Sequence, residues 1–300
     1  MTDRPLRFRR PVLLIVGCGD VGLRVARLLR DRWRLLALTS SAARLDALRA
    51  AGVVPLRGDL DRPETLGRLA GLADAVLHLA PPASAGVHDL RTARLIRALA
   101  RSPRLSRLVY GSTSGDYGDC HGERVDETRP LAPATDRARR RVDAEMRLRM
   151  FGRSAGVAVT ALRIPGIYAL GREGGDPRER LSRGAPVLAE GDDVYTNHIH
   201  ADDLARACVA ALYRGRTQRA VNASDDTELR MADYFDLAAD LHGLARPRRI
   251  SREEATGSLS TMQVSFMSES RRLVNRRLRE ELGLVLRYPT VADGLRASTD

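Results

Sequence analysis

The sequence contains no lysine, because all 50 of its basic residues are arginines. Against 38 acidic residues they leave a formal charge of +12, a balance typical of proteins that bind nucleic acid or anionic lipid. The excess is spread along the whole chain, aromatic residues make up only 4%, and no basic segment is interleaved with stacking side chains. We therefore expect no nucleic-acid partner, and the one-sided arginine usage indicates a compositional bias.

Cysteines and long apolar runs are also scarce. Cys18, Cys120 and Cys208 are far apart and lack the paired spacing of a zinc site, which indicates no metal centre and a reducing cytoplasm. No run approaches the roughly 18 apolar residues of a membrane span. The apolar run after the charged N-terminus ends in glycines at 17–19 and indicates a buried strand, not a secretion signal. We expect a globular cytoplasmic protein with a small-molecule substrate and no membrane partner.

Apolar runs and amphipathic segments alternate through the first half of the chain. Short apolar runs predict strands at 12–17, 34–39, 53–58, 74–80 and 107–113. Helical patterns lie between them, near 20–31, 41–51, 62–70 and 87–101. Because parallel strands need helical crossovers, this order predicts an α/β fold with a Rossmann-type, doubly wound parallel sheet.

The first strand runs directly into the motif GCGDVG at 17–22, which opens an amphipathic helix. In this context G-x-G-x-x-G predicts a dinucleotide site, since glycines permit a tight turn and a close approach of the backbone to a pyrophosphate. The free N–H groups and helix dipole favour the negative charge. The alternative is a tight turn with no ligand. The predicted cofactor-binding residues here are Gly17, Gly19, Asp20, Val21 and Gly22.

The second predicted strand ends without the acidic residue that binds the adenosine ribose in many such folds. Thr39, Ser40 and Ser41 stand there instead, and Arg44 follows one turn later. A missing carboxylate removes repulsion against a 2′-phosphate, which Ser40 or Arg44 could bind. The pattern favours NADP over NAD. Asp59, after the third strand, could reach the adenine edge or simply cap the next helix.

Beyond residue 114 the pattern continues and then loosens. A helix is expected near 135–151 and a strand at 157–164, followed by a loop-rich stretch at 165–193. We also expect a helix ending near 213 with Asp202 as its cap, a strand at 219–224, and helices near 230–243 and 268–282. These predict an NAD(P)-binding Rossmann domain formed by 1–164 and 194–225, and a small C-terminal substrate lobe formed by 165–193 and 226–300.

Several segments resemble the extended short-chain dehydrogenase/reductase superfamily, in its NAD(P)-dependent epimerase/dehydratase branch. They keep the order and spacing of that family over most of the chain: GCGDVG (17–22), RGDL (57–60), LHLAPP (77–82), LVYGSTSGDYGD (108–119), LRIPGIYALGR (162–172) and NHIHADDLA (197–205). The resemblance implies that Thr113 polarises a substrate oxygen and that His200 supports loops. It also implies cofactor contacts from Asp59, Leu60, Ala80, Pro81, Pro82, Pro165 and Gly166.

The family's catalytic Tyr-x-x-x-Lys pair is missing. Counted back from Glu145, which matches a family glutamate, its lysine falls on Arg141 and its tyrosine on Arg137. Arginine, with a pKa above about 12, cannot exchange protons near neutral pH. Arg141 could still bind the nicotinamide ribose and supply positive charge, but Arg137 cannot replace a phenol. The alternative is a solvated helix face with an ion pair between Arg141 and Glu145.

Tyr117 is the substitute acid that the sequence suggests, if Arg137 or Arg141 lowers its pKa. The alternative is a packed tyrosine with a satisfied hydroxyl group, and Asp116 and Asp119 are expected to be solvated loop carboxylates. Two functions stay open. One is an atypical oxidoreductase or epimerase/dehydratase-like enzyme acting on a carbonyl or hydroxyl of a small molecule or sugar nucleotide. The other is a catalytically silent NAD(P)-binding regulator similar to NmrA-like proteins.

Relatives in this superfamily often dimerise through the helices that correspond to 87–101 and 135–151. The second of these segments carries many arginines here, which disfavours a dry helix bundle. A homodimer is possible, but nothing in the sequence supports it.

Overall fold

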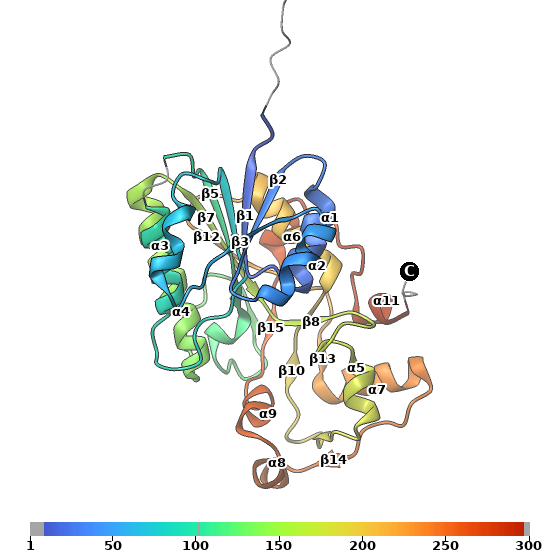
Figure 1. The fold of residues 1–300 in the computed structure, drawn as a ribbon. Coiled ribbons are helices and arrows are strands. Elements are labelled where there is room, and N and C mark those ends of the chain that lie inside the picture. The colour runs from blue at the N-terminus through green and yellow to red at the C-terminus, as the bar shows by residue number, and fades with distance from the viewer. Residues whose placement is uncertain (1–8, 101–102, 297–300) are drawn as a thin grey trace, which may run out of the picture.

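A computed structural model describes residues 9–100 and 103–296 of the chain. Its centre is a seven-stranded sheet of order β12-β7-β5-β4-β1-β2-β3, in which all neighbouring strands are parallel (Figure 1). The strands are β1 (Val12–Val16), β2 (Arg34–Thr39), β3 (Val54–Arg57), β4 (Ala75–His78), β5 (Arg107–Thr113), β7 (Ala158–Ile164) and β12 (Arg219–Asn222). The predicted Rossmann-type fold is confirmed.

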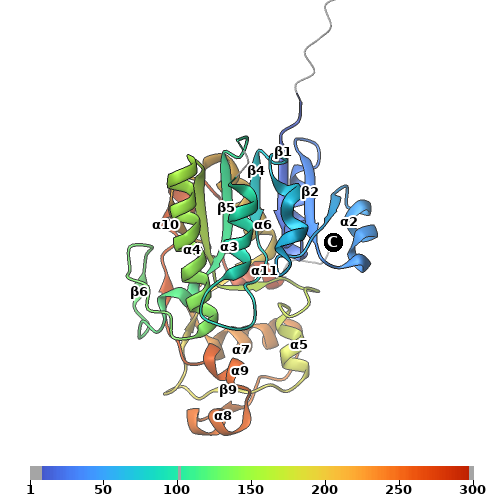
Figure 2. The same cartoon turned by 60° about the vertical axis from the view of Figure 1, so that its left-hand side comes forward.

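The central strands are apolar on both faces because helices cover both faces. Along β1, Leu13 and Ile15 belong to one buried cluster, whereas Leu14 and Val16 belong to the other, as the alternation of a strand requires. Helices α1, α2, α6 and α10 pack on the first face, and η2, α3 and α4 on the second (Figures 1 and 2). The helical segments are α1 (Asp20–Leu29), η1 (Ala42–Arg44), α2 (Leu45–Ala50), η2 (Pro63–Leu69), α3 (Leu90–Leu99), η3 (Ser114–Tyr117), α4 (Asp136–Ala155), α6 (Ala201–Arg214) and α10 (Arg276–Glu280).

A smaller group of elements lies below the carboxyl ends of the strands in Figure 1 and has an apolar core of its own. Phe235 and Leu181 lie in this core, on α7 and α5. The elements outside the large sheet are β6 (Arg124–Val125), β8 (Gly166–Tyr168), α5 (Pro177–Ser182), β9 (Val187–Leu188), β10 (Tyr195–Thr196), β11 (His198–His200), β13 (Leu229–Arg230), α7 (Met231–His242), β14 (Arg249–Ile250), α8 (Arg252–Ser258), α9 (Thr261–Phe266), β15 (Arg272–Leu273) and α11 (Val291–Arg296).

Three local predictions differ from the structure. The helix expected over 268–282 is wrong, because Arg272 and Val274 donate backbone hydrogen bonds to the segment around β6 at 2.9 Å each, and only α10 is helical. The helix near 62–70 is the 3-10 helix η2. Asp202 is not the cap of α6: the Nδ1 atom of His200 accepts its backbone N–H at 3.2 Å, so His200 caps this helix.

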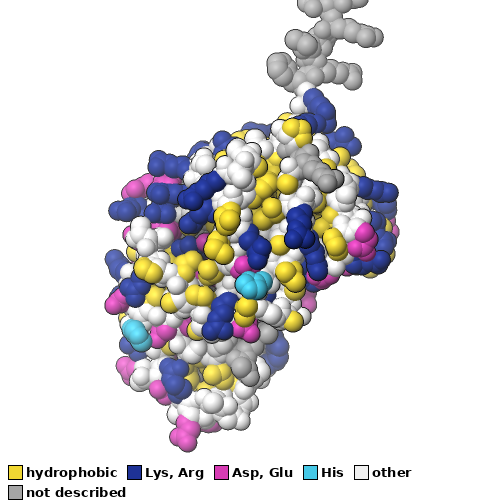
Figure 3. All heavy atoms as spheres, turned by 90° about the vertical axis from the view of Figure 1, so that its left-hand side faces the viewer, with side chains coloured by type: hydrophobic (Ala, Val, Ile, Leu, Met, Phe, Trp, Pro, Cys, Tyr) yellow, Lys and Arg dark blue, Asp and Glu magenta, His cyan; other side chains and the backbone are white. Residues whose placement is uncertain are grey.

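The outer face formed by α3 and α4 mixes arginines with apolar side chains (Figure 3). Its exposed apolar residues are Val87, Leu90, Met146 and Met150. No described helix is both long and apolar enough to cross a membrane.

Candidate cofactor and active site

The turn between β1 and α1 is shaped by its three glycines. Gly17 has a φ of 87°, and a Cβ there would lie 2.4 Å from the backbone nitrogen of Ala80 at the end of β4. A Cβ on Gly22 would lie 3.3 to 3.4 Å from Cys18 and Ile15, so this glycine lets α1 pack closely on the sheet. A Cβ on Gly19 would meet nothing within 4 Å. Two glycines are therefore required by packing, whereas Gly19 leaves space for a ligand.

The first turn of α1 is free to bind an anion. Its N-cap, Gly19, provides no side-chain hydrogen bond, so the first backbone N–H groups of the helix have no capping partner. The carboxylate of Asp20 lies at the same end, and it pairs with Arg24 and Arg172 at 3.0 Å each. These two guanidinium groups offset the negative charge that would otherwise repel a pyrophosphate.

A cleft of about 230 Å³ extends from this turn along the carboxyl ends of β1 to β4. It brings together many of the predicted cofactor residues, namely Gly17, Ser40, Arg44, Asp59, Leu60, Ala80 and Pro81. Pro82 follows Pro81, and Asp20, Val21 and Gly22 belong to the adjoining first turn of α1. The residues present fit a dinucleotide: a glycine-lined turn, a free helix N-terminus and a polar cleft lie side by side.

Arg44 reaches from η1 back to the glycine turn, where its Nη2 donates to the carbonyl oxygen of Cys18 at 2.7 Å. Ser40 and Arg44 are exposed at the mouth of the cleft. The Cys18 thiol is buried in the turn, and burial raises its pKa to about 11, so it is inert as a nucleophile.

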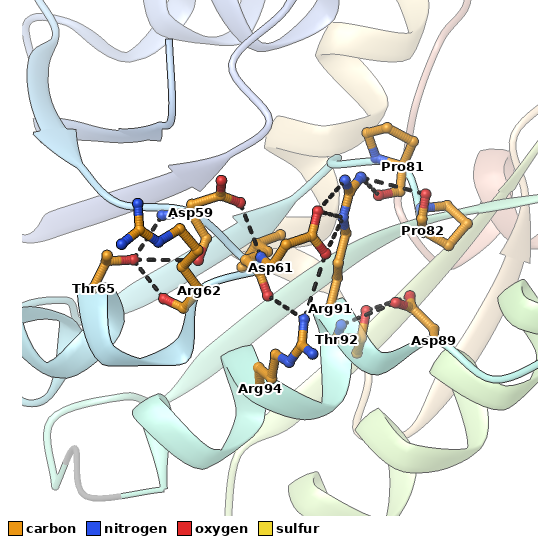
Figure 4. A network of polar contacts seen from close by, with 11 residues as sticks. Asp59, Asp61, Arg62, Thr65, Pro81, Pro82, Asp89, Arg91, Thr92 and Arg94 are labelled. Atoms are coloured by element: carbon orange, nitrogen blue, oxygen red, sulfur yellow. Dashed lines mark hydrogen bonds and ion pairs between the residues drawn. The ribbon is translucent and has the colours of Figure 1, made fainter. Parts of the chain in front are cut away.

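Arg91 on α3 also lines the cleft, although no motif in the sequence marked it as a candidate. Its guanidinium holds the carboxylate of Asp61 through Nε at 3.0 and 3.1 Å. Its Nη1 donates to the carbonyl oxygens of Pro81 at 3.2 Å and Pro82 at 3.4 Å (Figure 4). Arg94 donates to the carbonyl of Leu60 at 3.1 Å. The two arginines thus tie the loops after β3 and β4 together beside the cleft.

Three more predicted residues follow β5 and β7, at the same edge of the sheet. Thr113 pairs in register with Ile164, the residue before Pro165, so these positions are neighbours. The Thr113 hydroxyl accepts the backbone N–H of Gly115 at 3.3 Å. Gly166 opens β8 and is exposed. The strand ends therefore bring the predicted substrate-orienting and nicotinamide residues together.

The structure does not support Tyr117 as the substitute acid that the sequence suggested. It is 1% exposed, its hydroxyl donates to Oδ1 of Asn222 at 2.7 Å, and it accepts from Nη1 of Arg163 at 2.9 Å. Burial raises its pKa to about 12, and the arginine beside it is Arg163, so the expected lowering by Arg137 or Arg141 is wrong. The geometry favours a packed tyrosine over a substitute acid.

The expected solvated helix face is also wrong in part. Glu145 pairs with Arg163 and not with Arg141, at 2.9 and 3.2 Å, and both side chains are only 4% exposed. Asp116, expected in solvent, is completely buried and hydrogen-bonded to Ser112 at 2.9 Å. Burial and the nearby Glu145 raise its pKa well above the usual range. A buried polar network therefore underlies this end of the site.

The two arginines at the catalytic-pair positions lie on one face of α4. Nη1 of Arg141 donates to the carbonyl oxygen of Gly111 at 2.7 Å and to the Tyr110 hydroxyl at 3.1 Å, next to the end of β5. Arg137 is exposed in the first turn of α4, with its guanidinium 5.2 Å from the centre of the Phe266 ring. Neither is oriented by an ion pair within the described residues.

Glu269 is a further residue that sequence reasoning missed. It lies between α9 and β15, and its Oε2 accepts from Arg271 at 2.7 Å. A Cβ built on Gly115 would lie 3.6 Å from Oγ1 of Thr113 and 4.0 Å from Oε2 of Glu269, so both oxygens lie close to Gly115. No motif in the sequence marked it as a candidate.

Comparison with known proteins agrees with this geometry. Residues 13–224 match the model of the NAD dependent epimerase/dehydratase family. None of the curated proteins matches the sequence. A functionally unknown conserved protein from Silicibacter pomeroyi is 30% identical, with a TM-score of 0.81 over 95% of this chain and 96% of the other.

Two enzymes of lower identity show the same fold. UDP-glucose 4-epimerase from Thermotoga maritima is 20% identical, with a TM-score of 0.77 over 95% of this chain and 96% of that one. A double mutant of the dTDP-glucose 4,6-dehydratase DesIV from Streptomyces venezuelae, solved with NAD bound, is 21% identical, with a TM-score of 0.76 over 95% and 94%. With its glycine turn, its sheet order and a family match over most of its length, the chain belongs to the NAD dependent epimerase/dehydratase family, for which an NAD(P) cofactor is typical.

Proposed function

We propose that the protein is an atypical NADP-dependent enzyme that acts on a carbonyl or hydroxyl group of a small polar molecule or sugar nucleotide. The observation on which the proposal rests is the cleft beside Gly19, where the exposed Ser40 and Arg44 stand in place of a carboxylate. A cationic side chain favours the 2′-phosphate of NADP, and no acidic residue at the end of β2 repels it.

At the end of the site where the substrate would react, Thr113, Glu269 and Arg141 have different roles. When bound, the cofactor exchanges a hydride with the substrate carbon. The hydroxyl group of Thr113 hydrogen-bonds the substrate oxygen, and the carboxyl group of Glu269 exchanges a proton with it. In oxidation the carboxylate of Glu269 would take up the proton of the substrate hydroxyl group, and in reduction it would return that proton to the substrate oxygen. Arg141, held by Gly111, supplies positive charge beside the nicotinamide ribose.

Binding of the cofactor is tested by titrating NADPH and NADH and following nicotinamide fluorescence. We expect NADPH to bind more tightly than NADH and Arg44→Ala to lose about tenfold or more of that preference, as loss of a charge-assisted hydrogen bond implies. Arg49→Ala is the matched control, because Arg49 pairs with the exposed Asp46 at 2.8 Å, away from the cleft. Equal affinity for both cofactors in the wild-type protein would refute the NADP assignment.

Catalysis is tested by following NADPH absorbance with a panel of carbonyl compounds and sugar nucleotides. We expect turnover with at least one class, and a loss of about 100-fold or more in kcat for Glu269→Gln with little change in NADPH affinity. Glu269→Gln keeps the shape of the side chain and can still hydrogen-bond Arg271. Unchanged kcat in this variant would remove Glu269 from the mechanism.

A second function is favoured by one observation, the burial of Tyr117. With its hydroxyl bonded to Asn222 and Arg163, Tyr117 is not placed to exchange protons with a substrate, so a silent NADP-binding regulator fits the same cleft. Tight NADPH binding without turnover over the whole panel would select this function over the enzyme.

A further inference from the structure

Arg137 is a cation without a counter-ion. Within the described residues its guanidinium makes neither a hydrogen bond nor an ion pair, and it lies 5.2 Å from the centre of the Phe266 ring. The arginines next to it on α4 are held in place. Arg139 pairs with Asp136 at 2.8 Å, and Arg140 donates to the carbonyl oxygen of Gly86. Arg137 is therefore the helix arginine whose donors stay available at the reacting end of the site.

The charges around Arg137 do not neutralise it. Although the side chain is exposed overall, desolvation of the guanidinium and the neighbouring Arg141 lower its pKa, and the carboxylates of Glu269 and Asp116 only partly offset them. Glu269 lies on the same side, but its Oε2 is bonded to Arg271 at 2.7 Å. Like charges four residues apart on a helix destabilise it unless something compensates. An anion between the two guanidinium groups would compensate both.

The position of Arg137 links this charge to the reaction. Helix α4 packs against η3, whose N-cap is Thr113, and the family's proton-donating tyrosine falls on residue 137. Arg137 and Arg141 occupy i and i+4 of one helix face, and Arg141 is anchored at the end of β5. A group bound by Arg137 would therefore lie beside the substrate oxygen that Thr113 contacts.

We propose that Arg137, with Arg141 behind it, binds an oxyanion group of the substrate, a carboxylate or a phosphate, next to the reacting carbon. This inference rests on the proposed function and narrows its substrate class to acidic molecules. The planar guanidinium suits bidentate binding of either group. The enzyme thus selects its substrate with the residue that has replaced the family's proton donor.

The test uses two oxyanion probes and one neutral probe, titrated calorimetrically into the full chain with and without NADPH. Malonate represents carboxylates, inorganic phosphate represents phosphates, and malonamide is the uncharged analogue of malonate. We expect malonate or phosphate to bind at least tenfold more tightly than malonamide, and Arg137→Met to lose that difference. Whichever anion binds better identifies the oxyanion.

Arg139→Met is the matched control on the same helix turn, since Arg139 is already paired with Asp136, and we expect it to bind both anions like the wild-type protein. The proposal is overturned if the anions bind no better than malonamide, or if Arg137→Met binds them as tightly as Arg139→Met. NADPH affinity, measured in the same variants, is expected to stay unchanged. Failure of the wild-type protein to bind NADPH would refute the proposed function, whereas the anion titrations without cofactor would still decide the role of Arg137.

Discussion

One end of the site is formed mainly by backbone, whereas the other is formed mainly by side chains. At the β1–α1 end, the cofactor space is lined by backbone: Gly17 at a positive φ against Ala80, and Gly19 with open space where a side chain would stand. At the β5–β7 end, the same edge of the sheet is filled by side chains bonded to one another, with Arg163 joined to both Glu145 and Tyr117. The first end is open and the second is locked.

This difference explains which end has kept the family pattern. Backbone N–H groups and glycines bind a pyrophosphate whatever the surrounding composition, so the turn survives in a chain without lysine. Proton transfer needs particular side chains, and here arginines occupy positions 137 and 141. Arg141 retains the positive charge of the family's lysine, but neither arginine can exchange a proton near neutral pH. The two ends therefore respond to substitution in opposite ways.

The largest expected effect is on stability, at the locked end. Arg163→Met leaves the carboxylate of Glu145 buried without its partner, which costs about 3–5 kcal/mol in the free energy of unfolding measured with urea. Arg129→Met is the control, because its ion pair with Glu123 is exposed and contributes little. The double variant Arg163→Met/Glu145→Leu is expected to recover much of the loss. Equal stability of Arg163→Met and Arg129→Met would contradict the locked network.

At the open end, Gly19→Val is expected to weaken NADPH binding strongly without affecting folding. A valine at Gly19 meets no protein atom at its Cβ but fills the space beside the helix N-terminus, so NADPH affinity should fall about 100-fold or more, roughly 3 kcal/mol. Gly67→Val is the control, since Gly67 also has nothing within 4 Å and lies outside the cleft. Both variants should melt like the wild-type protein. A Gly19→Val protein that binds NADPH normally would place the cofactor elsewhere.

A pH titration tests how tightly the region around β8 is packed. His198, paired in register with Gly166 and stacked 4.1 Å from the Tyr234 ring, has its pKa lowered to about 3 by burial. Unfolded histidine titrates near 6.5, so between these values the unfolded chain binds more protons and stability falls as the pH falls. From pH 7 to 5 this amounts to about 2 kcal/mol from His198 alone.

His198→Phe is expected to reduce this acid sensitivity in urea unfolding at the two pH values, because phenylalanine keeps the ring contact and removes the titration. It should not abolish the sensitivity, since burial lowers the pKa of His78 to about 4 as well. The exposed His121 supplies the control His121→Asn. An unchanged pH dependence in His198→Phe would show that His198 is more accessible than the structure indicates.

The sequence predicted the sheet and the open end because both depend on local patterns. Strand–helix alternation and a glycine motif lie within short segments, and parallel strands bring the residues after them to one edge without further information. The sequence alone could thus predict that one cleft contains Gly17, Ser40, Arg44 and Asp59. The preference for NADP remains a prediction.

The locked end depends on contacts between distant segments, which no local pattern reveals. Glu145 on helix α4 pairs with Arg163 on strand β7. Arg141 lies four residues before Glu145 on the same helix, which is the spacing that favours an ion pair, but it does not form one with Glu145. Glu269, from the C-terminal segment, and Thr113 both lie near Gly115, and the helix expected over 268–282 is replaced by backbone pairing with β6. Side-chain partners of this kind are set by tertiary packing, so the sequence assigned them wrongly or missed them.

The smallest expected effect separates the two accounts of Tyr117. Tyr117→Phe removes the hydrogen bonds to Asn222 and Arg163, but Asn222 keeps its bonds to Val125 and Val274, and Arg163 keeps Glu145. The variant should lose about 1–2 kcal/mol of stability and retain both NADPH affinity and turnover per folded molecule. If Tyr117 acted as the acid, the variant would instead lose turnover by orders of magnitude at nearly constant stability. Measuring turnover and stability in one variant therefore decides between a packed tyrosine and a catalytic acid.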